Sequence, residues 1–167
     1  AQRLQQLQAE LFGQAADDAG NPLYDVELVG LSAGPVRTLS GFAMVPNRGP
    51  EGLDSADTVV IPGTRMQEVR FDGTCPAELR EALDRVRTGT RMVSICTGAF
   101  ALAAAGVLDD RPATTHWDKA DDLRRLYPSV RLDSDVLFVD DGDVLTSAGL
   151  AAGIDLCLHV IRRDHGA

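Results

Sequence analysis

A cysteine lies where a short apolar run meets an alanine-rich run. Residues 91–106 read RMVSICTGAFALAAAG, and the apolar residues at 92–96 are typical of a central strand in a parallel sheet. The alanine-rich residues 99–105 favour a helix. The Cys96 sulfur then lies beside free N–H groups of a helix N-terminus, where the dipole favours a thiolate and holds an anion. Gly98 permits close approach of backbone and ligand. We predict the geometry of a nucleophile elbow, with the functional site around it.

Three roles remain open for Cys96: a nucleophile, a redox-sensitive thiol, or a ligand contact. The alternative is a small buried hydrophobic residue, which is what most free cysteines are. Cys75, before a proline, and Cys157, in an apolar run, are interpreted as structural. Three cysteines without a CxxC motif argue against a disulfide framework or a zinc site and favour a reducing cytoplasm.

Two other segments end predicted strands. His116 is a candidate base or orienting partner for Cys96, although a histidine there equally satisfies a backbone carbonyl. Gly63 and Thr64 follow the run DTVVIP and would offer backbone N–H groups to an oxyanion, unless they form an ordinary turn. Trp117 is expected to line the pocket or to plug the base of the next helix. Ligands bind at the carboxyl ends of central parallel strands, so we expect these segments at one edge.

The acidic cluster at residues 140–143 (DDGD) lacks the spaced ligands and closing glutamate of a calcium loop, so we predict a hairpin turn. The sequence contains no P-loop and no GxGxxG motif, which leaves nucleotide binding unsupported. We predict no metal and no cofactor.

The elements that position these residues alternate between strands and helices. Strands are expected at residues 24–29, 36–45 (two short ones around Gly41), 57–61, 92–96, 112–116, 136–139 and 144–146. Helices are expected at 2–12 with Gly13 as cap, 76–87 with Pro76 in the first position, 99–105, 117–126 and 151–163. Alternation at this spacing predicts an α/β sandwich with a mostly parallel central sheet.

Size and charge narrow the function. A chain of 167 residues suits one domain. Its net charge of −9, from 16 basic and 25 acidic residues, repels phosphate backbones and argues against direct nucleic-acid binding. No apolar run approaches a bilayer span, so we expect no membrane association. The chain starts without a methionine, which suggests processing or trimming.

The segment SICTGAFALAAAGVLDDRPATTHW (94–117) resembles the ThiJ/PfpI superfamily, and more narrowly the amidase-like sensor domain of GlxA-type AraC-family transcription regulators. Residues 135–167 and the run DTVVIPG are similar to the same group, so the likeness covers most of 23–167. The combination is specific, whereas each motif alone is weak.

The resemblance implies a flavodoxin-like three-layer sandwich, also described as class I glutamine amidotransferase-like, in residues 1–167. It implies a homodimer and a pocket around Cys96, with His116 matching the neighbouring histidine and Gly63 the oxyanion-loop glycine. Ligand-binding residues would then be Gly63, Thr64, Cys96, Thr97, Gly98, His116 and Trp117. In the regulators a helix-turn-helix domain follows, which would lie beyond Ala167 and would make any DNA contact.

Two departures from the family pattern bear on activity. Enzymes of the superfamily carry an acidic residue near the end of a first strand, which is missing here; Gln5, Gln6 and Leu7 stand near its place, and Glu10 further on. The missing strand leaves the edge of a neighbour exposed or filled by another segment. Protease-like members have histidine after the cysteine, where this chain has Thr97.

These features favour a non-catalytic domain that senses a small polar or anionic effector for a transcription regulator. The alternative is a cysteine-dependent enzyme of the isonitrile hydratase or glyoxalase-like kind, in which Cys96 attacks an electrophilic carbon and His116 assists. A third hypothesis is a sensor of oxidants through Cys96.

Overall fold

The computed structural model describes residues 9–32, 34–37, 41, 43–149 and 151–166, so most of the predicted first helix, with Gln5, Gln6 and Leu7, lies outside the described residues. Its centre is a four-stranded sheet in the order β3 (Thr58–Ile61), β4 (Arg91–Ile95), β8 (Val144–Ser147), β7 (Phe138–Asp141). The first three strands are parallel and β7 is antiparallel to β8, which confirms a mostly parallel sheet. β3 forms one edge of this described sheet.

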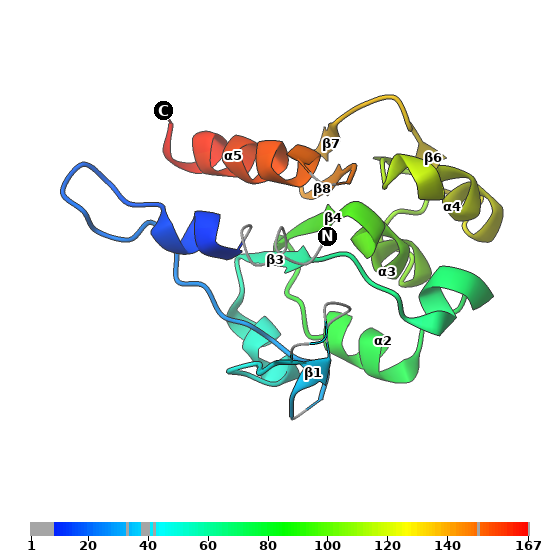
Figure 1. Cartoon of the computed structure of the whole chain (residues 1–167), viewed down its shortest axis with the longest axis horizontal. Helices are drawn as coiled ribbons and strands as arrows, with labels where there is room; N and C mark the ends of the chain where they lie inside the picture. The colour runs from blue at the N-terminus through cyan, green and yellow to red at the C-terminus, as the bar shows by residue number, and fades with distance from the viewer. Residues whose placement is uncertain (1–8, 33, 38–40, 42, 150, 167) are drawn as a thin grey trace.

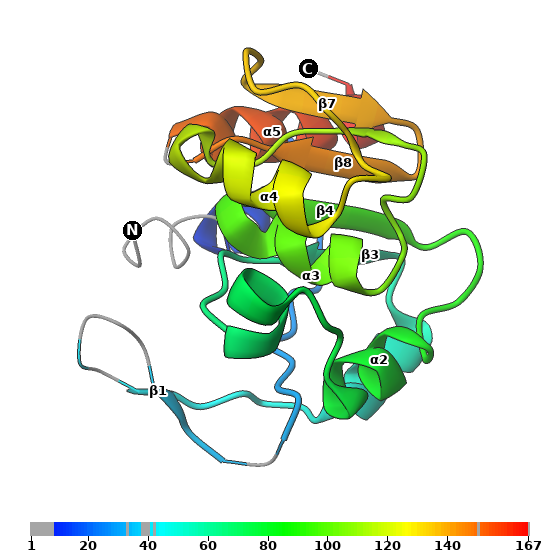
Figure 2. The ribbon, with the colours of Figure 1, turned by 90° about the vertical axis from the view of Figure 1, so that its right-hand side faces the viewer.

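Helices cover both faces of the sheet (Figures 1 and 2). α2 (Ala77–Leu83), α3 (Ala99–Ala104) and α4 (Ala120–Leu126) lie on one side, and α5 (Ala151–His165) with helical residues 9–14 lies on the other. Side chains of β4 alternate between the two cores: Met92 packs with Phe100 and Leu123, whereas Val93 and Ile95 pack with the α5 side. The predicted three-layer sandwich is confirmed.

Several local predictions are confirmed. The DDGD residues close the hairpin between β7 and β8: Asp140 and Asp141 end β7, and Gly142 lies in the turn with a φ of 81°. The extended region around Gly41 forms two short antiparallel strands, β1 (Val36–Arg37) and β2 (Ala43–Met44).

One predicted strand was wrong, and a second is shorter than predicted. Residues 24–29 form a loop instead of a strand, and Val26 and Leu28 in it are exposed. Within the part of the chain that the structure describes, its one strand-like contact is an isolated bridge between Val29 and Arg48. The predicted strand at 112–116 reduces to β5 (Pro112–Ala113), which pairs in parallel with β6 (Arg131–Leu132) outside the main sheet. Residues 24–29 have the apolar alternation of a strand, but neither segment has a full-length neighbour to pair with among the described residues.

The helices differ from prediction mainly at their ends. The helix at residues 9–14 continues through Gly13 rather than ending there. α2 begins at Ala77, with Pro76 as its N-cap, and ends at Leu83. The expected helix at 117–126 starts with a 3-10 turn, η4 (Trp117–Lys119), and the chain contains two unpredicted turns, η1 (Pro50–Ser55) and the π-helical η2 (Glu68–Asp72).

An ion pair joins the start of β4 to the end of α5. The guanidinium of Arg91 donates two hydrogen bonds to Asp164, of 2.6 and 2.8 Å, and the Tyr24 hydroxyl donates a third of 3.0 Å. Both charged side chains are only about one-fifth exposed, at 19% and 20%. This clamp fixes the last turn of α5 against the central strand.

Candidate functional site

The turn after β4 has the geometry of an elbow. β4 ends at Ile95, Cys96 takes a φ of 57°, and the single 3-10 turn η3 (Cys96–Gly98) leads directly into α3. A left-handed backbone costs a non-glycine residue about 1–2 kcal/mol, so it persists only where the surroundings impose it. This confirms the predicted elbow at Cys96.

The elbow is bonded to two neighbouring strand ends. The Thr97 hydroxyl accepts a hydrogen bond from the Thr64 N–H and donates one to the Thr64 carbonyl, both of 3.0 Å. The buried Thr115 hydroxyl donates to the Cys96 carbonyl at 2.9 Å. The loop after β3 and the segment after β5 therefore meet at Cys96, as expected from the strand ends.

These bonds correct one expectation. The Thr64 N–H was a candidate oxyanion donor, but it is already bonded to the Thr97 side chain. A backbone donor paired inside the protein must break that bond before it can serve a ligand, at a cost of roughly 1 kcal/mol or more. Thr64 thus fixes the elbow in the observed state.

Gly98 packs the elbow against the end of β3. A Cβ atom at this position would lie 2.3 Å from the carbonyl oxygen of Ile61 and 2.8 Å from that of Pro62. Both obstacles are backbone atoms, so a side chain has no space without displacing one of the two segments. The close approach predicted at Gly98 is therefore an approach to β3.

The Cys96 thiol is half-buried. Burial raises its pKa above the usual value and outweighs the opposing effects of hydrogen bonding with Thr97 and of the Arg70 charge. Burial therefore favours the neutral thiol of Cys96 over the thiolate that the sequence predicts.

His116 and Trp117 stand at the end of the β5 segment. The His116 Nδ1 accepts a hydrogen bond of 3.2 Å from the Asp118 N–H, and its ring fills the space over Gly149, where a Cβ would lie 2.3 Å from its Cδ2. Among the described residues no hydrogen bond joins His116 to Cys96. Trp117 stacks on His116 at 5.6 Å between ring centroids and is 70% exposed, so it does not plug the helix base.

The other cysteines occupy different surroundings. Cys157 is fully buried in α5, and burial raises the pKa of its thiol to about 12. Cys75 is half-buried beside Pro76, and burial raises its pKa as well. Both placements agree with structural roles.

Sequence reasoning missed Arg70. It lies in η2 and is only 4% exposed, with its guanidinium 3.9 Å above the ring of Phe100. Phe100 follows Cys96 by one helical turn, so a buried cation lies close to the elbow. Burial lowers the pKa of Arg70, while the negative charge of Asp122 opposes that effect. The sequence EVRFD showed no periodic pattern that would have singled out this arginine.

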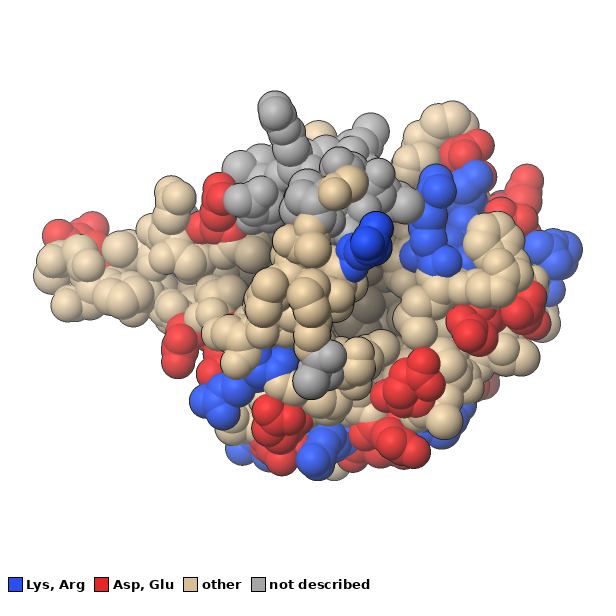
Figure 3. Space-filling model, turned by 60° about the horizontal axis from the view of Figure 1, so that its bottom comes forward, with Lys and Arg blue, Asp and Glu red and all other residues tan. Residues whose placement is uncertain are grey.

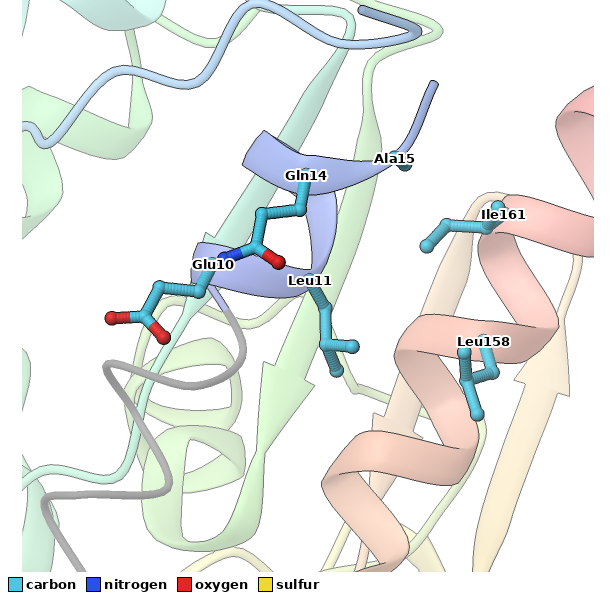
Figure 4. A pocket seen from close by; sticks show the side chains of 6 residues that line it. All are labelled: Glu10, Leu11, Gln14, Ala15, Leu158 and Ile161. Atoms are coloured by element: carbon cyan, nitrogen blue, oxygen red, sulfur yellow. The ribbon is translucent and has the colours of Figure 1, made fainter. Parts of the chain in front are cut away.

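A surface pocket of about 330 Å³ lies on the opposite side of the sheet from α3. Figure 4 shows its walls, the helix at residues 9–14 facing α5. Its lining is mostly apolar and includes the sequence candidate Glu10, but not Cys96. Glu10 lies at the edge of this groove, and its carboxylate points away from α5 in Figure 4.

The acidic hairpin is held by cations from the protein itself. Asp140 accepts hydrogen bonds from Arg163 and pairs with the His159 Nε2, and Arg111 bonds both Asp141 and Asp143. These bonds stabilise the turn.

Comparisons with known proteins show which family this chain belongs to. The DJ-1/PfpI family model matches residues 12–163. The regulator GbdR of Pseudomonas aeruginosa, an HTH-type transcriptional regulator, is 31% identical over 149 residues, which cover 89% of this chain and 39% of that protein. The isonitrile hydratase of Pseudomonas putida is 32% identical over 156 residues, 90% of this chain and 64% of that enzyme.

A solved structure extends the comparison to the fold. A crystal structure of an AraC family transcriptional regulator from Pseudomonas putida matches with a TM-score of 0.67 and 22% identity, covering 96% of this chain and 81% of that chain. This chain spans well under half the length of the curated regulator GbdR, at 39%. The matched residues cover most of the chain, and the chain belongs to the DJ-1/PfpI family.

Proposed function

We propose that this chain is the small-molecule-sensing domain of an AraC-type transcription regulator. The observation that carries the proposal is the match to GbdR along 89% of the chain. DNA contact would come from a separate helix-turn-helix domain, since the net charge of −9 here repels phosphates. Figure 3 shows acidic and basic side chains mixed along the rim of one face, rather than a basic stripe.

The proposed effector site is the elbow and its neighbours: Gly63, Thr64, Cys96, Thr97, Gly98, His116 and Trp117. Within this set the Thr64–Thr97 bonds and the packing of Gly98 position the turn, and the partly exposed Cys96 and His116 with the exposed Trp117 contact the ligand. A homodimer in the cytoplasm completes the proposal. None of the described helices has the length and apolarity that crossing a bilayer requires.

The state of the thiol supports the proposal of a non-catalytic role. Nucleophilic attack needs a thiolate and an acceptor for its proton. Burial raises the Cys96 pKa instead, and the described hydrogen bonds direct the His116 Nδ1 to Asp118. Both features favour binding over turnover.

The second candidate is an isonitrile hydratase-like enzyme, favoured by the 32% identity to that protein. Purified chain is incubated with an alkyl isonitrile and, separately, with methylglyoxal, next to the variants Cys96→Ser and Cys75→Ser. We expect no turnover in any of them. Turnover that disappears only in Cys96→Ser would overturn the sensor proposal.

The sensor proposal itself is tested by thermal unfolding in the presence of a panel of small polar metabolites. We expect at least one compound to raise the Tm, and the rise to persist in Cys96→Ser. A hundredfold excess of ligand over its Kd adds about 2.7 kcal/mol, which is easily detected. In cells that contain the full-length gene product and a reporter of its promoter, the same compound should change reporter transcription. A compound that binds the chain without changing transcription would contradict a regulatory role.

A further inference from the structure

Arg70 is a buried charge with an unpartnered hydrogen-bond donor. It is 4% exposed, its Nη1 atom is buried with no hydrogen-bond partner, and no carboxylate of the described residues pairs with it. The acid whose charge acts on it most, Asp122, bonds Arg125 instead at 3.4 Å. An unpaired buried charge is costly, and arginine does not escape that cost by losing its proton.

The surroundings hold the guanidinium in one place. Phe100 lies under it at 3.9 Å and the exposed Phe71 ring lies 5.5 Å away. Phe100 is itself fixed by the edge of Tyr127, at 6.2 Å, and the Tyr127 hydroxyl donates a 2.7 Å hydrogen bond to the Val69 carbonyl of the same turn, η2. The cation is thus supported by stacking, while its Nη1 is left without a hydrogen-bond partner.

Phe100 brings the Arg70 guanidinium close to the elbow. η2 packs against α3, whose first turn follows Cys96 directly, and the Arg70 charge acts on the Cys96 sulfur. A ligand that reaches Cys96 therefore enters the field of a desolvated guanidinium, which matches a planar carboxylate with two parallel hydrogen bonds.

We propose that Arg70 is the recognition residue for a carboxylate on the ligand that binds at Cys96. This rests on the proposed sensing function and names its ligand class: a small carboxylic acid whose charged end contacts Arg70. A carboxylate carries the single negative charge that one arginine balances, whereas a phosphate near pH 7 leaves part of its charge uncompensated beside a protein of net charge −9.

The test uses two alkylating probes of similar size, anionic iodoacetate and neutral iodoacetamide, at low ionic strength. Peptide mass mapping gives the rate at each cysteine. Both reagents need the thiolate, so the ratio of the two rates cancels any change in pKa and reports local attraction of the anion. The iodoacetate-to-iodoacetamide ratio should be about fivefold higher at Cys96 than at the half-buried Cys75.

In Arg70→Gln the ratio at Cys96 should fall to that at Cys75, whereas Arg124→Gln, which removes an exposed arginine of α4, should leave it unchanged. An equal ratio at Cys96 in the parent and in Arg70→Gln would overturn the assignment. If Arg70→Gln does not fold, the parent chain decides: sodium acetate should slow iodoacetate labelling of Cys96 more than inorganic phosphate at equal ionic strength, and the reverse order would exclude a carboxylate site.

The outcomes separate this inference from the sensing function. The rate ratio is measured on the chain alone, so it stands even if no promoter responds. Conversely, a regulator whose effector is uncharged would keep its function while the ratio shows no Arg70 dependence.

Discussion

Replacing Gly98 with alanine tests the packing of the elbow against β3. Gly98 has helical angles, φ −59° and ψ −26°, so alanine brings no backbone strain and gains about 1 kcal/mol of helix propensity. Its Cβ, however, would lie 2.3 Å from the Ile61 carbonyl oxygen. A normal C···O contact is about 3.3 Å, so the two segments must separate by roughly 1 Å.

Forcing extra atoms into a packed site costs about 1–3 kcal/mol, and the upper end applies here because both obstacles are backbone carbonyls. Subtracting the propensity gain leaves a loss of about 2 kcal/mol in the free energy of unfolding. For a chain of this length that lowers the Tm by about 4–8 °C. Far-UV circular dichroism during heating and a urea titration measure both quantities.

The matched control is Gly13→Ala. Gly13 is also helical, but a Cβ there meets nothing within 4 Å. This variant should be unchanged or about 0.5–1 kcal/mol more stable. If Gly98→Ala were as stable as Gly13→Ala, the close approach of η3 to β3 would not exist and the reasoning would be refuted.

Three further predictions concern residues at the two ends of β4. Asp164→Asn weakens the clamp on Arg91 and should cost about 2 kcal/mol by urea titration. The bonds from Arg91 and Tyr24 lower the Asp164 pKa. The stability that Asp164 contributes is therefore present above about pH 4 and is lost as the pH falls through its lower pKa in the folded state. The variant should accordingly lose less stability on acidification than the parent chain. Thr97→Val leaves the Thr64 N–H unpaired and should cost about 1–3 kcal/mol. Iodoacetamide labelling of Cys96 should rise about tenfold per pH unit from pH 7 to 9, since its pKa is raised.

Each of these predictions has a control. Asp121→Asn removes a fully exposed partner of Arg124 and should change stability by less than about 0.5 kcal/mol. Thr97→Ser keeps the hydroxyl and should retain most of the stability that Thr97→Val loses. A plateau in the Cys96 labelling rate below pH 8 would indicate an activated thiolate and would favour the enzyme hypothesis over the sensor.

The elbow could be predicted from the sequence because its signals are local. An apolar run, a cysteine and an alanine-rich run define strand, turn and helix within sixteen residues, and the structure places a left-handed Cys96 between β4 and α3. The hairpin at Gly142 was predictable for the same reason.

Other features depend on partners distant in the chain. The segment at 24–29 has the alternation of a strand, but in the part of the chain that the structure describes its strand pairing is limited to one bridge, between Val29 and Arg48. Arg70 looked like any surface arginine, and its burial arises because η2 packs against α3, 30 residues later at Phe100. The engagement of the Thr64 N–H likewise required knowing that Thr97 reaches it.

The clamp on β4 has a mechanical consequence. The strand is hydrogen-bonded on both sides, to β3 and β8, and five extended residues span about 17 Å with almost no capacity to stretch. Cys96 follows one end, and the other end is tied through Arg91 to Asp164 near the close of α5. A shift of the elbow along the axis of β4 when a ligand enters must therefore also move the final turn of α5, on the far side of the molecule.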